Sequence, residues 1–371
     1  MTIALLGAGM VGHAMALDLA ASHTVTAFDA SADKLAALQQ KNPAIRTMQA
    51  DLRQTDNYRD WLTPFDLVIT AVPGFMGYAT LQATIAAGKH VADISFFPEN
   101  ALTLDALARQ HGVTVITDCG VAPGMSNLVL GRYNALMKID SFACYVGGLP
   151  QHPQPPFYYK APFSPIDVIE EYTRPARLVQ NGQVVTLPAL TDRELMQVEG
   201  AGTLEAFNTD GLRSLLYTMS HIPDMKEKTW RYPGHLDLVI ALQEAGFFST
   251  APVTVNGLPV RPLDMAVSLL LPQWKLQPGE PELTVMQIII KGEGKIIRYG
   301  LLDHYDAATG ISSMARTTGY TCTAAAELIL QGLFTEKGVY PPELVGNREA
   351  CFEFVLSYLG ERGVRWKVSN E

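Results

Sequence analysis

The sequence predicts an α/β protein in which a doubly wound parallel sheet is followed by a second domain, of α+β type, built on an antiparallel sheet. Three observations predict this arrangement. Apolar runs typical of buried strands alternate with helix-like stretches from residue 2 to about residue 121, and such alternation produces a parallel sheet covered by helices. A glycine-rich segment follows the first apolar run. Farther along the chain, paired runs joined by Asn-Gly turns indicate antiparallel hairpins.

The glycine-rich segment, GAGMVG at residues 7–12, has the surroundings of a dinucleotide-binding turn. The apolar run 3–6 precedes it, a helix-like stretch follows it, and Asp29 closes the next strand-like run, 25–28. In such a turn the first glycine permits a tight bend, the second lets the backbone approach a pyrophosphate, and the third allows close packing of helix on strand. Amides at the start of the helix then bind the phosphates. The turn predicts a Rossmann-type domain with phosphate contacts at Gly7, Gly9, Met10, Val11 and Gly12.

Asp29 indicates NAD rather than NADP as the cofactor. A carboxylate at this place accepts hydrogen bonds from the ribose 2′-hydroxyl, whereas its charge would repel a 2′-phosphate. The segment 29–33 also holds no arginine to receive that phosphate.

Further strand-like runs lie at 44–48, 67–71, 91–94 and 113–117, with helix-like stretches at 31–41 and 77–87. The carboxyl ends of parallel strands meet at one edge of the sheet, where ligands bind. Residues at those ends are therefore expected beside the cofactor, although capping of the following loop is an alternative role for each. The expected neighbours of the cofactor are Asp51, Ala71, Val72, Pro73, Ser95 and Cys119.

After Cys119 the pattern becomes that of an antiparallel sheet. A strand-like run at 140–146 precedes a proline-rich loop, and the two Asn-Gly turns lie at 181–182 and 256–257. A third hairpin runs from Leu283 to Leu302 and turns at residues 292–294. A helical stretch at 319–331 and the tail are expected to return to the first domain. The expected units are a nucleotide-binding domain at 1–122, a substrate domain at 123–315 and C-terminal helices at 316–371.

Composition excludes several classes of partner. The chain has 371 residues and a formal net charge of −9, without a basic stripe, which argues against binding to nucleic acid or to an anionic membrane surface. No run approaches the ~20 apolar residues of a membrane span. The four cysteines are scattered, without a C-x-x-C pair or clustered histidines. We therefore expect a cytoplasmic protein without a metal site.

The segment DCGVAPGMSNLVLGR, residues 118–132, resembles the saccharopine dehydrogenase superfamily. Other segments resemble lysine 6-dehydrogenase within that superfamily, and so does the shorter chain, since saccharopine reductases carry a larger inserted second domain. These segments are VGGLP (146–150), YYKAPFSPIDVIEEYTRPA (158–176), EAFNTDGLRSLL (205–216) and KTWRYPGHLDL (228–238).

The resemblance implies NAD-dependent oxidation of the terminal amine of L-lysine, giving an aldehyde, ammonia and NADH. It also implies a homodimer or higher homo-oligomer with the second domain at the interface. Two alternatives stay open. One is a saccharopine-type dehydrogenase acting on a secondary amine, and the other is a non-catalytic NAD-binding sensor.

Amine oxidation requires a base, because the nitrogen lone pair must be free before hydride leaves the neighbouring carbon. A lysine ammonium titrates near pH 10.4, so neutralising it at pH 7 costs about 4.6 kcal/mol. His235, after a Pro-Gly turn, is the first choice because of its ordinary pKa, with a capping or core role as the alternative. Asp118, at the end of the last strand, is expected to orient the amine or a water molecule, or else to cap the next helix.

Residues that would bind the α-carboxylate and the α-ammonium of the substrate are chosen by their charge. An arginine offers a planar, two-pronged donor to an α-carboxylate. Cys119 is interpreted as a buried neighbour of the nicotinamide rather than a nucleophile, because no step requires a thiolate. The residues expected to bind substrate are Arg231 and Arg316 for the carboxylate, Glu205 and Asp210 for the α-ammonium, and Tyr159 and Lys160 as pocket lining.

Overall fold

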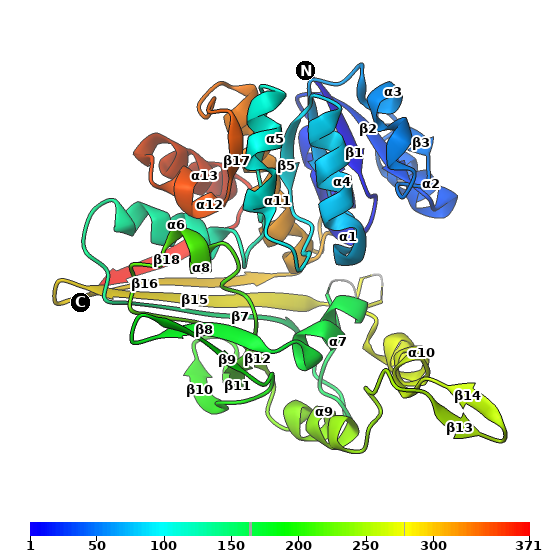
Figure 1. Cartoon of the computed structure of the whole chain (residues 1–371), viewed down its shortest axis with the longest axis vertical. Helices are drawn as coiled ribbons and strands as arrows, with labels where there is room; N and C mark the ends of the chain where they lie inside the picture. Colours follow the sequence, from blue (N-terminus) through cyan, green and yellow to red (C-terminus); the bar gives the residue numbers. More distant parts are fainter. Residues whose placement is uncertain (163–164, 278) are drawn as a thin grey trace.

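The computed structural model describes residues 1–162, 165–277 and 279–371, without the side chains of 165–167. Two sheets, each with its helices, form an upper and a lower body in Figure 1. The chain passes from the first body to the second near residue 125 and crosses between them again after residue 304.

The first sheet has seven strands in the order β17-β6-β5-β4-β1-β2-β3, and every neighbouring pair is parallel. Its first six strands in chain order have the doubly wound arrangement, which confirms the predicted Rossmann-type fold. Central strands are buried on both faces, as their apolar sequences require. The strands are β1 (Thr2–Leu6), β2 (Thr24–Asp29), β3 (Arg46–Gln49), β4 (Leu67–Thr70), β5 (His90–Asp93), β6 (Thr114–Ile116) and β17 (Gly338–Tyr340).

Helices cover both faces of this sheet. The N-cap of α2 is Ser31, whose hydroxyl accepts the amide of Lys34 at 3.3 Å. The elements are α1 (Met10–Leu19), α2 (Ala32–Lys41), η1 (Thr55–Asn57), α3 (Tyr58–Leu62), α4 (Gly74–Ala86), η2 (Ala101–Leu104) and α5 (Asp105–Gln110). The long α11 (Ser313–Leu330) packs on α1 and also touches β15 of the second sheet. It therefore joins the two bodies.

The second sheet is mixed, with the path β10-β11-β12-β7-β15-β16-β18 and the hairpin β8–β9 attached to β12. An antiparallel sheet is expected from the sequence, but its central pair, β7 and β12, is parallel. The chain between these two strands forms α7 (Pro165–Thr173), β8 to β11 and α8 (Leu215–Thr218), and it is long enough for the crossover that parallel pairing needs. The strands are β7 (Ser141–Pro150), β8 (Ala176–Gln180), β9 (Gln183–Leu187), β10 (Glu194–Val198), β11 (Gly202–Asn208), β12 (Asp224–Arg231), β15 (Glu282–Gly292), β16 (Lys295–His304) and β18 (Trp366–Asn370).

The three hairpins expected from the sequence are present as β8–β9, β13–β14 and β15–β16. Asn181 and Asn256 have positive φ at the first two turns, as Asn-Gly turns require. The remaining elements are α6 (Met125–Asn134), α7 (Pro165–Thr173), α8 (Leu215–Thr218), α9 (His235–Glu244), β13 (Val253–Val255), β14 (Leu258–Val260), α10 (Pro262–Trp274), α12 (Pro342–Gly346) and α13 (Glu349–Glu361).

The C-terminal segment contributes to both bodies, because β17 pairs with β6 and β18 pairs with β16. One cluster of buried apolar residues runs from α1 through α11 to the strand β15. This continuous core fixes the position of the second sheet relative to the carboxyl edge of the first. Within the described residues, no helix has the length and apolar character needed to cross a membrane.

Candidate active site

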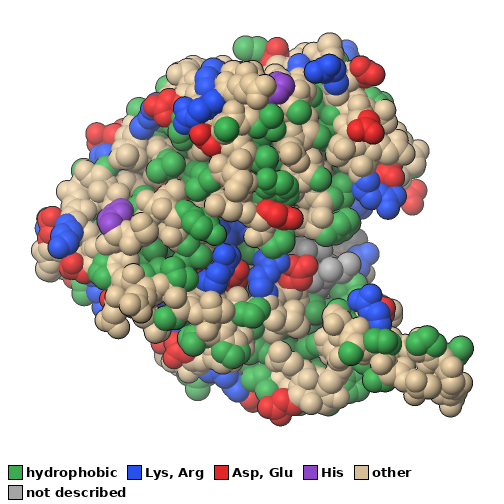
Figure 2. Space-filling model, in the orientation of Figure 1, with side chains coloured by type: hydrophobic (Ala, Val, Ile, Leu, Met, Phe, Trp, Pro, Cys, Tyr) green, Lys and Arg blue, Asp and Glu red, His purple; other side chains and the backbone are tan. Residues whose placement is uncertain are grey.

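A cavity of about 850 Å³ lies between the carboxyl edge of the first sheet and the second sheet. Figure 2 shows the hollow between the two bodies, with acidic and basic side chains at its inner end. The strand ends and α1 form one wall, and β7, β12 and α7 form the other. This is where ligands of doubly wound sheets bind.

The phosphate turn has the geometry that its glycines predict. Gly7 has a φ of 110°, and a Cβ there would lie 2.3 Å from the Ala71 carbonyl oxygen. A Cβ on Gly12 would lie 2.0 Å from the Gly7 carbonyl oxygen, whereas one on Gly9 would meet no atom within 4 Å. Gly9 therefore faces open space in the cavity. The first helical hydrogen bond joins the His13 amide to the Gly9 carbonyl at 2.8 Å, so the amides of residues 10–12, in the first turn of α1, are not used by the helix and can bind an anion.

Asp29 lies at the end of β2 and lines the end of the cavity beside the glycine turn. Its carboxylate accepts the amides of Ala8 at 2.9 Å and Ser31 at 2.8 Å. Two cations line the same end. Lys34 is 3.7 Å from the Asp29 carboxylate, and Arg53 is held by Asp51 at 2.7 Å, which lowers the pKa of Asp51 to about 2. This end of the cavity therefore holds both a carboxylate and two exposed cations.

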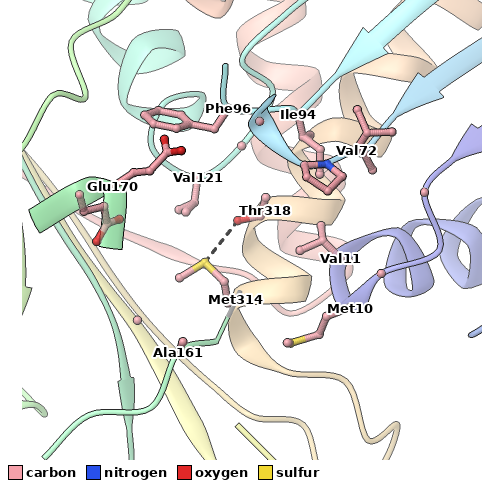
Figure 3. Close-up of a pocket in the computed structure, with 18 of the residues that line it drawn as sticks. Met10, Val11, Val72, Ile94, Phe96, Val121, Ala161, Glu170, Met314 and Thr318 are labelled. Atoms are coloured by element: carbon pink, nitrogen blue, oxygen red, sulfur yellow. Dashed lines mark hydrogen bonds between the residues drawn. The ribbon is translucent and has the colours of Figure 1, made fainter. Parts of the chain in front are cut away.

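The middle of the cavity is apolar and is built by both bodies. Figure 3 shows Val11 and Val72 facing the same space as Met314 of α11. The Thr318 hydroxyl donates to the Met314 sulfur at 3.4 Å. This apolar part of the cavity suits a flat ring, because burial there needs few polar partners.

Strand β12 supplies the polar wall at the inner end. Its alternate residues Glu227, Thr229 and Arg231 line the cavity, as the two-residue period of a strand requires. The intervening Lys228 points to the opposite face, where it pairs with Asp192 and Glu194 at 2.8 Å each. One short strand thus places a carboxyl, a hydroxyl and a guanidinium on a single line.

Glu227 is a buried carboxyl in this wall, 5% exposed. Burial raises its pKa to about 8, and the negative charges of Glu171, Asp210 and Asp118 act in the same direction, while Arg213 opposes them. Gly211 makes room for it, since a Cβ on Gly211 would lie 1.6 Å from the Glu227 carboxyl. Glu227 can therefore gain and lose a proton near neutral pH, as a general acid or base must.

Replacing Glu227 by glutamine is expected to stabilise the free protein at alkaline pH. The carboxyl titrates near 4.5 when unfolded and at about 8 when folded, so the folded state holds an extra proton between these values and stability falls as the pH rises through that window. Glutamine does not ionise. Urea unfolding should show a gain in the free energy of unfolding of about 4–5 kcal/mol at pH 9 and of about 1 kcal/mol or less at pH 5. Equal effects at both pH values would contradict the raised pKa.

Asp118 lines the same end of the cavity, as expected from its place after β6. Its carboxylate accepts the Arg213 guanidinium at 2.9 Å, and both side chains are buried. Burial raises the pKa of Asp118, and the Arg213 charge acts in the opposite direction. The residue has a φ of 54°, a left-handed conformation that is uncommon for non-glycine residues and that aspartate adopts more readily than most.

Arg231 lines the cavity, but His235 does not. His235 is fully buried behind Arg231: one ring nitrogen lies 2.8 Å from the Tyr172 hydroxyl and the other 2.8 Å from the Phe157 carbonyl. Arg231 in turn donates to the Tyr172 hydroxyl at 3.0 Å and to Glu171 at 2.7 Å. Burial lowers the pKa of His235 to about 3. This placement does not suit the expected base, and His235 instead supports Arg231 as a neutral ring.

Some of the other residues expected in the site line the cavity, and others do not. The cavity wall includes Asp210, which is also bound by Arg177 at 2.8 Å, and the cofactor residues Asp51, Ala71, Val72 and Pro73. Six expected residues do not line it. These are Ser95, a buried acceptor for the Val72 amide; Cys119, buried against the Ile116 carbonyl; Tyr159, stacked on Arg231; Lys160, bound to the Gln273 carbonyl; Glu205, paired with Arg193; and Arg316, paired with Asp303.

Sequence reasoning missed Glu227 and Thr229. The segment DMKEKTWR, residues 224–231, is polar at six of its eight positions and has no alternation that would mark these two residues as facing a site. It also missed the polar residues that other elements bring to this end, namely Glu170 and Glu171 from α7, Arg174 directly after α7, Thr209 from the loop after β11, and Lys275 from the end of α10. Among the residues that the structure describes, no cluster of His, Cys, Asp and Glu could hold a metal ion.

A family model described as the saccharopine dehydrogenase C-terminal domain matches residues 120–364. The chain belongs to the saccharopine dehydrogenase family. A second model, described as the saccharopine dehydrogenase NADP binding domain, matches residues 3–116. The superfamily and the oxidoreductase class expected from the sequence are thereby confirmed.

Individual relatives are distant, and some of them match nearly the whole chain. The NADP(+)-dependent, L-glutamate-forming saccharopine dehydrogenase of Schizosaccharomyces pombe is 22% identical over 98% of each chain. The mitochondrial alpha-aminoadipic semialdehyde synthase of Rattus norvegicus is 26% identical over 49% of this chain and 21% of its own length. The apo structure of the L-Glu-forming saccharopine dehydrogenase from Saccharomyces cerevisiae superposes with a TM-score of 0.80 at 19% identity, covering 100% of this chain and 99% of that one. This likeness supports the fold.

Proposed function

We propose that this family member is an NAD-dependent dehydrogenase that converts the terminal amine of L-lysine to an aldehyde. The overall change is balanced as lysine ammonium, NAD⁺ and water giving aldehyde, ammonium, NADH and one proton. Bound NAD would accept hydride from the carbon that carries the nitrogen. The chain's own residues must hold the amine, remove its proton and bind the distant α-carboxylate.

The observation that carries this proposal is the charge of the inner end of the cavity. Among the described residues, its wall holds five carboxyl groups (Asp118, Glu170, Glu171, Asp210 and Glu227) and three basic groups (Arg174, Arg231 and Lys275). These carboxyls are acceptors for the two ammonium groups of a substrate such as lysine. Four of the five also pair with an arginine: Asp118 with Arg213, Glu170 with Arg174, Glu171 with Arg231 and Asp210 with Arg177. Saccharopine carries additional carboxylates and would require more cations.

Each catalytic requirement has a candidate group in the wall. Asp118, paired with Arg213, is suited to hold the reacting ammonium as a carboxylate. Glu227 is suited to take its proton, because a carboxyl with a pKa of about 8 changes charge close to the working pH. Arg231, Arg174 and Lys275 are the candidate partners of the α-carboxylate. A nucleotide bound across the apolar middle of the cavity would keep bulk water from these groups.

The cofactor is proposed to be NAD because the Asp29 carboxylate would repel a 2′-phosphate. Lys34 and Arg53 favour NADP in part, and NADP stands in the name of the Schizosaccharomyces pombe relative. We expect kcat/KM for NAD to exceed that for NADP by about tenfold or more, equivalent to about 1.4 kcal/mol. Asp29→Ser should reduce or reverse this preference, and Arg53→Ser should increase it. A preference for NADP in the wild type would contradict the assignment.

A saccharopine-type dehydrogenase is the second candidate, favoured by the names of relatives that match nearly the whole chain. Reduced-nicotinamide absorbance with lysine, ornithine, diaminopimelate and saccharopine compares the substrates. A kcat/KM highest for lysine supports the proposal, and one highest for saccharopine supports the second candidate. Nucleotide binding without turnover of any amine would indicate the sensor. The homo-oligomer expected from the resemblance stays a prediction, which light scattering tests.

A further inference from the structure

The pair formed by Arg213 and Asp118 joins the two bodies of the molecule at the cavity wall. Asp118 follows β6 of the first sheet, whereas Arg213 lies between β11 and α8 of the second body. The guanidinium donates to the Asp118 carboxylate at 2.9 Å and also to the Phe97 carbonyl, which follows β5. Its central carbon lies 4.5 Å from the centre of the Phe96 ring. One side chain is therefore fixed to the first body at three points.

The ion pair between Arg213 and Asp118 contributes little net stability to the fold. The Arg213 and Asp118 side chains are 7% and 5% exposed, and desolvation of two buried charges offsets most of their attraction. Both residues also have positive φ, 45° and 54°, a conformation that costs about 1 kcal/mol or more for a non-glycine residue. Two strained, buried residues that meet at a cavity wall indicate a role in the site.

Asp118 borders two cavities, and its ion pair with Arg213 holds the carboxylate in one orientation. Asp118 lines the main cavity and also a second cavity of about 20 Å³, which Arg213, Thr117 and Ser214 line as well. That volume is sufficient for a single water molecule. Without the guanidinium, the carboxyl would be free to turn to this second cavity, away from a substrate.

We propose that Arg213 is a positioning residue, which fixes the Asp118 carboxylate in the wall of the main cavity and keeps it ionised for an ammonium substrate. This inference rests on the proposed function for the role of Asp118, although the state of the Asp118 carboxyl can be measured without turnover. Arg213 does not line the main cavity itself. It acts through Asp118 and through the Phe96 ring, which does line it.

Arg213→Met tests the inference, because methionine retains an apolar stem against Phe96 and removes the charge. NMR titration of protein labelled with ¹³C at the aspartate carboxyls, with Asp118→Asn to assign the signal, reports the Asp118 midpoint. Burial raises the Asp118 pKa and Arg213 opposes this, so the midpoint should move upward by one pH unit or more in Arg213→Met. Arg213→Lys retains a charge and should give a smaller upward shift, and it serves alone if the methionine variant does not fold.

Kinetics supply the second readout, provided that the wild type oxidises lysine. Arg213→Met should raise KM for the amine more than it lowers kcat, and should move the acid limb of kcat/KM to higher pH. The loss of kcat/KM caused by Arg213→Met should not add to the loss caused by Asp118→Asn, because both substitutions act on one carboxylate. Arg362→Met is the matched control: Arg362 binds Asp18 at 2.6 Å, away from the cavity, so its loss should lower stability and leave the Asp118 midpoint unmoved.

An Asp118 midpoint that does not change in either Arg213 variant would overturn the inference. So would a uniform loss of activity at every pH that adds fully to the loss of Asp118→Asn. If no amine is oxidised by the wild type, the proposed function fails, and the NMR titration still decides the role of Arg213. The two failures are therefore distinguishable.

Discussion

Replacing Glu227 by glutamine is expected to lower kcat for amine oxidation by about 10²- to 10⁴-fold, the usual contribution of a general base. The carboxyl lines the inner end of the cavity and has a pKa of about 8. Below that pH it is protonated and cannot accept the ammonium proton, so wild-type kcat/KM should rise with pH through about 8. Glutamine should abolish this rise. Steady-state NADH formation between pH 6 and pH 10 measures both effects.

Glu194→Gln is the matched control for this experiment. Glu194 lies on β10 and binds Lys228 at 2.8 Å on the face of the sheet opposite to the cavity. Its replacement should change stability slightly and leave the pH dependence of turnover as in the wild type. Full turnover by Glu227→Gln, with the same rise through pH 8, would show that another group takes the proton.

Gly9→Ala is expected to abolish most cofactor binding without unfolding the protein. The backbone of Gly9 is extended, with a φ of −71°, and an added Cβ would meet nothing within 4 Å of the protein. That open space is where the pyrophosphate must approach. The dissociation constant for NADH should rise by about 100-fold, or about 2.7 kcal/mol, while stability falls by about 1 kcal/mol or less. Fluorescence titration with NADH and thermal unfolding measure these quantities.

Gly12→Ala provides the contrast. A Cβ there would lie 2.0 Å from the Gly7 carbonyl oxygen, a backbone atom that cannot turn aside, so the fold itself should lose about 1–3 kcal/mol or more. If Gly9→Ala binds NADH as tightly as the wild type, the nucleotide lies elsewhere and the proposed dehydrogenase cannot be correct.

The first domain is predictable from the sequence because its determinants are local. A buried strand, a glycine turn and a helix occupy consecutive positions, so residues 3–29 specify both the fold and the place of the phosphates. Asn-Gly turns specify hairpins for the same reason. The parallel pairing of β7 with β12 is not local. It joins segments about 80 residues apart, and nothing in either segment identifies its partner.

The substrate end of the site was less predictable because five separate segments meet there. Asp118, Asp210 and Arg231 were expected in the site, and the structure places all three in the cavity wall. His235 was chosen for its ordinary pKa, yet burial lowers that pKa to about 3, whereas burial raises the pKa of Glu227 to about 8. A base is defined by its surroundings in the folded protein. Those surroundings come from residues distant in the sequence.

The products formed per lysine consumed distinguish oxidation of a primary amine from oxidation of a secondary amine. Purified protein is incubated with L-lysine and NAD, and NADH, ammonia and glutamate are measured in the same sample. We predict one ammonia for each NADH and no glutamate. Absence of NADH with lysine, together with NADH and glutamate from saccharopine, would contradict the proposed primary-amine chemistry.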